Sequence, residues 1–255
     1  MSKSAGHVMA MSLNITQPTK FDIPKMEFNQ IVFLVGPNGS GKTLILKLNW
    51  CFTMLANYFP VQRITGATID FKKEFQFIMD KSFDDNNFDG VIETFFENAT
   101  IKVEFKEGQV TNIEYSSDED LIPSSLPIFM SKETRTFESF VKYMKMKKAL
   151  GVTETYESFK HDDLIKLTDV YKLYDILFIE MMLSKMNGYT LTEDVKKALD
   201  EMFSLKLNID QIIVDNEECE VYGVNLETNE KQKLTRLSAG EQSILNMILA
   251  SYVNK

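Results

Sequence analysis

Apolar positions near the start of the chain change from a continuous run to a helical spacing. Residues 30–35 form, after one glutamine, an unbroken run of β-branched, aromatic and other apolar side chains. Such a run is typical of a strand buried on both faces of a parallel sheet. From residue 43 to residue 59 the apolar positions recur at helical spacing, which predicts a helix that ends at Pro60. A glycine-rich segment joins the expected strand to the expected helix.

Residues 61–115 carry shorter apolar stretches that alternate, or nearly alternate, with polar positions. Turn-forming residues separate these stretches, notably at 84–87 and 106–109. The pattern predicts hairpins that join into an antiparallel β-subdomain. Its expected strands lie at residues 68–71, 75–78, 91–96 and 99–105.

A helical lobe is expected over residues 136–205, where apolar residues return to a spacing of three and four. Gly151 and Gly188 are suited to end its first two helices, because glycine readily adopts the left-handed conformation found at helix ends. A threonine followed by a glutamate at 190–193 resembles a capping box that opens the third helix. The first two expected helices cover residues 138–150 and 156–186, and the third runs from the capping box at 190–193 to about residue 205.

The C-terminal part of the chain returns to strands and then to a helix. Strands are expected at residues 211–215 and 219–226, and a final helix begins near Ser238. The whole pattern predicts an α/β fold. We expect one domain over residues 12–255, with its last helix in 237–255 and a flexible lead-in at 1–11 before it.

The chain carries 37 acidic and 28 basic residues, a formal charge of −9. Such a surface repels phosphate backbones, so nucleic-acid binding is not supported, although a local basic patch at 142–148 would be compatible with it. No apolar run approaches the about twenty residues of a membrane span, and the N-terminus lacks the apolar core of a signal peptide. With only two cysteines as well, we expect a cytoplasmic protein without a membrane segment.

Residues 36–43 match the phosphate-loop pattern G-x-x-x-x-G-K-[ST], between the expected strand and helix. Glycines let the backbone turn sharply and direct its N–H groups to a phosphate at the positive end of the helix. Lys42 can reach the β- and γ-phosphates, and the Thr43 hydroxyl suits Mg²⁺. The sequence therefore predicts bound ATP and magnesium. The residues assigned to the nucleotide are Gly36, Pro37, Asn38, Gly39, Ser40, Gly41, Lys42 and Thr43.

A second motif, Leu-Ser-Ala-Gly-Glu-Gln at residues 237–242, opens the last expected helix. Ser238 is a candidate N-cap, Gly240 keeps the backbone bare, and Glu241 lies in the first turn, where a carboxylate is favoured. The motif has two interpretations from its residues alone: a well-capped helix start or a functional signature.

Together the two motifs resemble the ABC ATPase superfamily, in particular its soluble SMC-type, DNA-repair and OLD-like AAA members. Residues 36–43 match the GPNGSGK[ST] variant of the loop, and residues 237–242 match the LSxGE[QKR] form of the signature. The resemblance implies a P-loop ABC-ATPase-like core in which two domains pair head to tail around ATP. It also implies that the signature contacts the γ-phosphate held by the other subunit. The signature residues are Leu237, Ser238, Ala239, Gly240, Glu241 and Gln242.

The family pattern is incomplete, because the sequence stops at Lys255 within the expected signature helix. In the family, a Walker B strand ending in Asp-Glu follows the signature, and its carboxylates bind Mg²⁺ through water and activate the attacking water. Without them ATP can be held but not hydrolysed. Residues 212–217 also end an apolar stretch in acids, but they precede the signature and resemble a hairpin turn. No catalytic residue besides Lys42 is identified.

Three functions are compatible with these observations. The chain is the nucleotide-binding part of an ABC-type ATPase whose hydrolysis needs elements from another polypeptide. Alternatively, it is a non-hydrolysing module or decoy that pairs with an intact ATPase and regulates it. The third is a structural protein that retains a vestigial loop, which the intact Lys42 and Thr43 disfavour. We expect the partner to be a second copy or an ATPase-related polypeptide.

Overall fold

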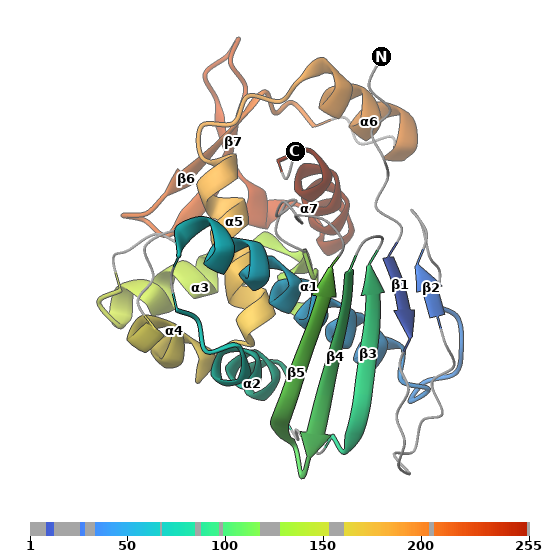
Figure 1. Cartoon of the computed structure of the whole chain (residues 1–255). Coiled ribbons are helices and arrows are strands. Elements are labelled where there is room, and N and C mark those ends of the chain that lie inside the picture. The colour runs from blue at the N-terminus through green and yellow to red at the C-terminus, as the bar shows by residue number, and fades with distance from the viewer. Residues whose placement is uncertain are drawn as a thin grey trace. The chain divides into compact units, whose positions relative to one another are not determined.

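The computed structural model describes nine segments of the chain and divides it into two units, 1–127 (unit 1) and 128–255 (unit 2). It is a mixed α/β fold with two antiparallel sheets and, among the described residues, seven α-helices (Figure 1). Every described strand pair is antiparallel, so no parallel core strand is among them. The described residues are 9–12, 26–28, 34–66, 68–84, 88–96, 99–117, 128–152, 161–203 and 207–253.

Unit 1 is built on a five-stranded sheet in the order β2-β1-β3-β4-β5. Strand β4 has regularly alternating burial, and its buried side chains form the inner face of the sheet. The hairpins β3–β4 and β4–β5 confirm the strands expected in the second half of the β-subdomain. The strands are β1 (Met9–Ser12), β2 (Met26–Phe28), β3 (Gly90–Phe96), β4 (Ala99–Lys106) and β5 (Gln109–Ser117).

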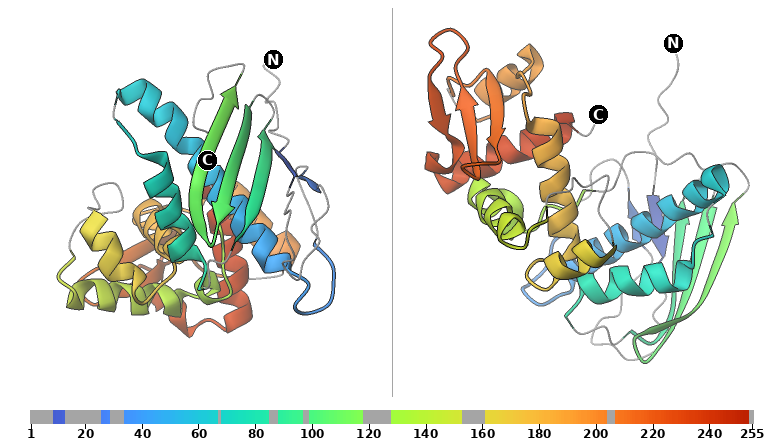
Figure 2. Two further views of the ribbon diagram at one scale, coloured as in Figure 1. Left: turned by 60° about the horizontal axis from the view of Figure 1, so that its bottom comes forward. Right: turned by 90° about the vertical axis from the view of Figure 1, so that its left-hand side faces the viewer.

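Helices α1 (Lys42–Thr65) and α2 (Phe71–Ser82) lie on the same side of this sheet (Figure 2). The rings of Phe52 on α1 and Phe75 on α2 are 5.2 Å apart, and Phe75 in turn lies 6.3 Å from Phe105 of β4. Edge-on and tilted aromatic contacts of this kind fill a core efficiently. This aromatic cluster joins the two helices to the sheet.

The first half of the expected β-subdomain is helical, so the strands expected at 68–71 and 75–78 are wrong. Buried positions of α2 are spaced by three and four residues, which is a helical period. Asp70 caps the helix, because its side chain accepts the N–H of Lys73 at 3.2 Å. A four-residue stretch cannot separate a period of 2 from one of 3.6, and longer-range packing decides between them.

Helix α1 also continues beyond the expected stop at residue 60. It ends at Gly66, which has a φ of 67° and donates its N–H to the Gln62 carbonyl oxygen at 2.8 Å. A proline removes one helical hydrogen bond, whereas a glycine in the left-handed conformation ends the helix geometrically.

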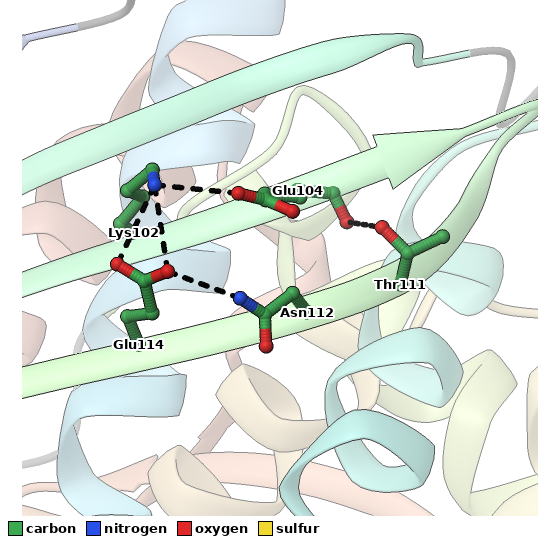
Figure 3. A network of polar contacts seen from close by, with 5 residues as sticks. All are labelled: Lys102, Glu104, Thr111, Asn112 and Glu114. Atoms are coloured by element: carbon green, nitrogen blue, oxygen red, sulfur yellow. Dashed lines mark hydrogen bonds and ion pairs between the residues drawn. The ribbon is translucent and has the colours of Figure 1, made fainter.

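The outer face of the unit 1 sheet is polar (Figure 3). Lys102 on β4 contacts Glu104 at 3.3 Å and the cross-strand Glu114 at 3.4 Å, and Asn112 donates to Glu114 at 3.1 Å. Hydrogen bonds to these two carboxylates raise the pKa of Lys102. The polar ladder defines which face of the sheet is directed to solvent.

Two expectations for the start of the chain differ from the structure. Strand β1 (Met9–Ser12) overlaps the lead-in expected at 1–11. Residues 30–33 of the expected strand lie outside the described residues. Leu34 and Val35 are described but are not in a strand, and Val35 is 92% exposed. This end of the apolar run is therefore not covered by the described part of unit 1.

Unit 2 has a helical core in which α5 (Leu173–Met186) is the central helix. Eleven of its fourteen residues are buried, including Asp175 and Glu180, which fits a helix at the centre of the unit. It packs against α3 (Phe137–Ala149) and α7 (Ala239–Val253). The other helices are η1 (Glu133–Arg135), α4 (His161–Thr168), α6 (Glu193–Phe203) and η3 (Leu234–Arg236).

The lobe helices follow the expected pattern with two changes. Gly151, with a φ of 68°, ends α3 as predicted. Residues 156–160 of the helix expected over 156–186 lie outside the described residues. The remainder forms two helices, α4 and α5, because the N–H groups of Val170 and Tyr171 turn back to the Leu167 carbonyl. The cap of α6 is Thr192, which accepts the N–H of Val195 at 3.4 Å. This cap lies two residues after Thr190, the cap of the expected capping box.

A three-stranded sheet completes unit 2, in the order β6-β7-β8. The two longer strands confirm the strands expected after residue 208. No helix in the described parts of either unit has the length and apolarity to cross a membrane. The strands are β6 (Gln211–Asp215), β7 (Glu220–Val224) and β8 (Lys231–Lys233).

Candidate functional site

The glycine-rich loop has alternating backbone conformations. Gly39 and Gly41 have φ values of 80° and 83°, whereas Asn38 and Ser40 keep negative φ. Alternation of this kind turns successive N–H groups toward one concavity, where they can bind an anion. Only glycine adopts the positive values without strain, which explains its use at both positions.

The first glycine of the loop lies close to the Ser40 side chain. A Cβ atom at Gly36 would lie 2.9 Å from the Ser40 hydroxyl oxygen, closer than side-chain atoms normally approach. Ser40 in turn donates its N–H to the Pro37 carbonyl oxygen at 3.3 Å. These contacts close the loop on itself.

The Lys42 ammonium lies against the loop. It donates to the Gly36 and Pro37 carbonyl oxygens, both at 2.7 Å, and lies 3.4 Å from the Ser40 hydroxyl. These contacts hold the positive charge at the loop, although the side chain is only half-buried. An ammonium has three donors that can be redirected to phosphate oxygens as the side chain moves.

The N-terminus of α1 is open to an anion. Its N-cap is Gly41, so no side chain caps the first amides, and the first turn contains no acidic residue. Helix α2, in contrast, is capped by Asp70 and has Glu74 in its first turn. The positive end of a helix dipole without a capping side chain favours a bound phosphate.

Thr43 lies in the first turn of α1 and is exposed. Its hydroxyl is a suitable ligand for Mg²⁺, but this ion prefers six oxygen ligands and the hydroxyl supplies one. Among the described residues, no group of three or more His, Cys, Asp or Glu side chains could hold a metal ion. Such a donor set fits Mg²⁺ only when phosphate oxygens and water supply the remaining ligands.

The signature turn of unit 2 is a capping box. Glu241 accepts the Ser238 N–H at 2.8 Å, and Ser238 accepts the Glu241 N–H at 3.3 Å. Hydrogen bonds from Ser238, first from its side chain and then from its amide, lower the pKa of Glu241. The structure thus bears out the well-capped helix start, and a signature function remains compatible with it.

The six signature residues differ in accessibility. Ser238, Ala239 and Gly240 are exposed, and a Cβ added at Gly240 would meet no atom within 4 Å. Leu237 and Gln242 are buried, at 8% and 3% exposure. The exposed segment 238–240 can therefore be reached by a ligand, whereas the side chains of Leu237 and Gln242 face the interior of unit 2.

Other polar candidates have structural roles. Asp215 accepts the N–H groups of Glu217 and Glu218 at 3.0 and 2.9 Å, so residues 212–217 are a strand and hairpin turn, as expected. Gln76 joins α2 to the β4–β5 turn: it accepts the Val110 N–H at 2.7 Å and donates to the Gly108 carbonyl at 3.1 Å. Gln62 is partly buried on α1.

A cleft of about 610 Å³ lies in unit 2, where the ends of α3 and α5 meet the β6–β7 turn. Its wall contains Lys147, paired with Glu180 at 2.6 Å, and Lys148, which donates to the Glu217 carbonyl at 2.8 Å. Both lysines of the basic run 142–148 that reach this cleft are thus engaged within the protein. The cleft therefore offers a less suitable anion site than the loop.

Sequence reasoning missed one feature near the signature. Asn246 is fully buried one helical turn after Gln242, and its polarity in an otherwise apolar helix is the signal that could have revealed it. Arg135 and Arg236 end the short helices η1 and η3, and both are exposed. Of the five methionines that the sequence predicts to pack in the core or the helical lobe, four are buried and Met146 is partly buried against them; the buried ones are Met144, Met181, Met182 and Met186.

The phosphate loop belongs to unit 1 and the signature turn to unit 2. Comparison with protein-family models, with curated proteins and with solved structures found no match to this chain.

Proposed function

We propose that this chain is a nucleotide-binding domain that holds Mg-ATP in the loop formed by residues 36–43. The observation that carries the proposal is the uncapped N-terminus of α1, with the Lys42 ammonium 2.7 Å from two loop carbonyls. Oriented amides, a helix dipole and a mobile cation are together suited to a polyphosphate. Thr43 would contribute one ligand to the magnesium ion that accompanies the nucleotide.

The exposed segment 238–240 is proposed to complete the nucleotide site of a second copy, as in the ABC ATPases that the two motifs resemble. The Ser238 hydroxyl accepts the Glu241 amide, and its own hydrogen, which is directed to the Glu241 carboxylate, can turn to a phosphate oxygen that approaches the helix end. Gly240 leaves the helix end open to close approach. ATP would then promote association, because each chain supplies a part that the other lacks.

Hydrolysis is proposed to need carboxylates from outside this polypeptide. Activation of water in phosphoryl transfer requires a positioned base and a metal held by acidic side chains. Among the described residues no group of three or more His, Cys, Asp or Glu side chains could hold a metal ion, and the first turn of α1 has no acid. The alternative is a non-hydrolysing regulator that pairs with an intact ATPase, and ATP turnover by the chain with and without such a partner separates the two.

The direct test is titration of the protein with Mg-ATP by calorimetry. Lys42→Ala should weaken binding at least about tenfold, the effect of losing a hydrogen bond to a charged group. Lys72→Ala is the matched control, because Lys72 is an exposed lysine of the same unit outside the loop. EDTA should also weaken wild-type binding. Equal affinity of the wild type and Lys42→Ala would contradict the proposal.

A further inference from the structure

Two amide side chains lie on one face of α7, directly after the signature turn. Gln242 and Asn246 are four residues apart, a spacing that places them side by side on a helix. They are 3% and 0% exposed in a helix whose other buried residues are apolar. A buried amide is costly unless its hydrogen bonds are made. Both side-chain nitrogens and the Gln242 oxygen have partners, whereas the buried Asn246 oxygen has none among the described residues.

The Gln242 side chain connects the start of α3 to the segment just before α7. Its oxygen accepts the N–H of Phe137, the first residue of α3, at 2.8 Å. Its nitrogen donates to the Leu237 carbonyl at 2.7 Å and to the Thr235 carbonyl at 3.3 Å. The N-cap residue of α3 does not cap the helix with its side chain, and Gln242 accepts the first N–H of the helix from 105 residues away.

Asn246 repeats the connection one turn later. Its nitrogen donates to the Thr134 carbonyl at 3.1 Å, in η1, just before α3. Thr134 is itself fully buried and hydrogen-bonded to Ser131. The two amides therefore attach α7 to the segment 131–137 at two points.

The hydrogen bonds of Gln242 restrict movement of the signature turn at residues 237–242. The carbonyls of Thr235 and Leu237 flank the start of the signature turn, and both are bound by the same nitrogen atom. The oxygen of the same amide group accepts the Phe137 N–H at the start of α3. Displacement of the turn therefore requires the Gln242 amide to lose a partner in a buried setting, which is unfavourable.

We infer that Gln242 is a positioning residue, which together with Asn246 fixes the exposed segment 238–240 to the start of α3 and does not contact nucleotide. The inference rests on the proposed function, because the fixed shape of segment 238–240 matters only if this segment contacts the phosphate of a nucleotide bound to a second copy. It departs from the resemblance, which implies that all six signature residues contact nucleotide.

The first test is hydrogen exchange of the full chain without nucleotide. Gln242→Ala should increase exchange together in segments 131–137 and 235–241, whereas Ser238→Ala should affect only the second. Gln76→Ala is the matched control, because Gln76 makes a similar amide bridge in unit 1. Unchanged exchange at 131–137 in Gln242→Ala would overturn the inference.

A second variant tests the same bridge if Gln242→Ala folds poorly. In Gln242→Glu, the protonated acid retains one acceptor and one donor, whereas the carboxylate retains acceptors only. Burial raises the pKa of such a carboxyl, so protection of both segments should recover toward the wild-type value as pH is lowered. Protection that stays low at every pH, or equals that of the wild type at every pH, would contradict the bridge.

The final measurement is mass in solution with Mg-ATP, by light scattering. Gln242→Ala should weaken ATP-dependent association at least tenfold while the affinity of each chain for ATP is unchanged. Loss of protection with normal association would overturn the positioning role. A wild-type chain that neither binds Mg-ATP nor associates would contradict the proposed function. The exchange experiment without nucleotide would still test whether Gln242 links segments 131–137 and 235–241.

Discussion

Ser238 and Glu241 each hydrogen-bond the main chain of the other, at 3.3 and 2.8 Å, across the first turn of α7. The pair satisfies two amides that a helix start would otherwise leave without partners. The arrangement gives this helix start a defined shape while Ser238 stays exposed. The cap therefore leaves the side chain of Ser238 accessible at the surface.

A bulky residue at the cap should separate association from nucleotide binding. Ser238→Arg should leave the affinity for Mg-ATP within about twofold, because the loop belongs to unit 1 and lies outside the changed segment. It should prevent ATP-dependent pairing, because the added side chain occupies the surface of the turn. Light scattering with and without ATP measures this, with Ser251→Arg, at an exposed serine near the other end of α7, as the control. Normal pairing of Ser238→Arg would exclude the turn from the interface.

The cap should make stability depend on pH through Glu241. Its folded pKa is lowered below the ordinary 4.5 by hydrogen bonds from Ser238. The carboxylate therefore contributes stability above about pH 4.5, and this contribution is lost as pH falls through the folded pKa. Melting temperatures of the wild type and Glu241→Gln should converge in that acidic range. Glu227→Gln, at an exposed glutamate, should show no such convergence.

The ion pair between Lys147 and Glu180 should be sensitive to loss of one partner. The two side chains are 17% and 6% exposed and 2.6 Å apart. Lys147→Ala leaves a buried carboxylate without its cation, which costs about 3–5 kcal/mol of unfolding free energy. Urea unfolding measures the change, and Lys142→Ala on the exposed face of α3 should stay within about 0.5 kcal/mol of the wild type. Equal midpoints for the two variants would show that the pair is not needed.

Cys51 should be unreactive in the folded protein. It is buried on α1, and burial raises its thiol pKa from 9.0 to about 12, against weaker opposing effects of Ser82 and Lys47. Thiolate is the reactive form, so at pH 8.5 its population falls roughly a thousandfold. Iodoacetamide labelling followed by peptide mass spectrometry should detect Cys51 only after unfolding. Rapid labelling of the native chain would show that α1 opens.

Local chemistry was predictable where short-range rules decide the structure. The glycines of the loop, the Gly151 terminus and the strands after residue 208 all depend on neighbouring residues. The Ser238 cap is of the same kind, since its partner is three residues away. Residues 68–78 show the opposite case. Their short apolar stretches fit a strand or a helix, and α2 forms because its buried side chains, with Phe75 among them, pack on α1 and β4.

The sequence by itself determined the glycine conformations of the loop at residues 36–43 and a capped helix start, because glycine conformation and caps act over a few residues. Only the tertiary structure decided that Gln242 faces inward, because its partner Phe137 is 105 positions away. It also decided the burial of Asn246 and the pairing of Lys147 with Glu180. Contacts between distant segments depend on how whole elements pack, and a pattern of neighbouring residues does not encode them.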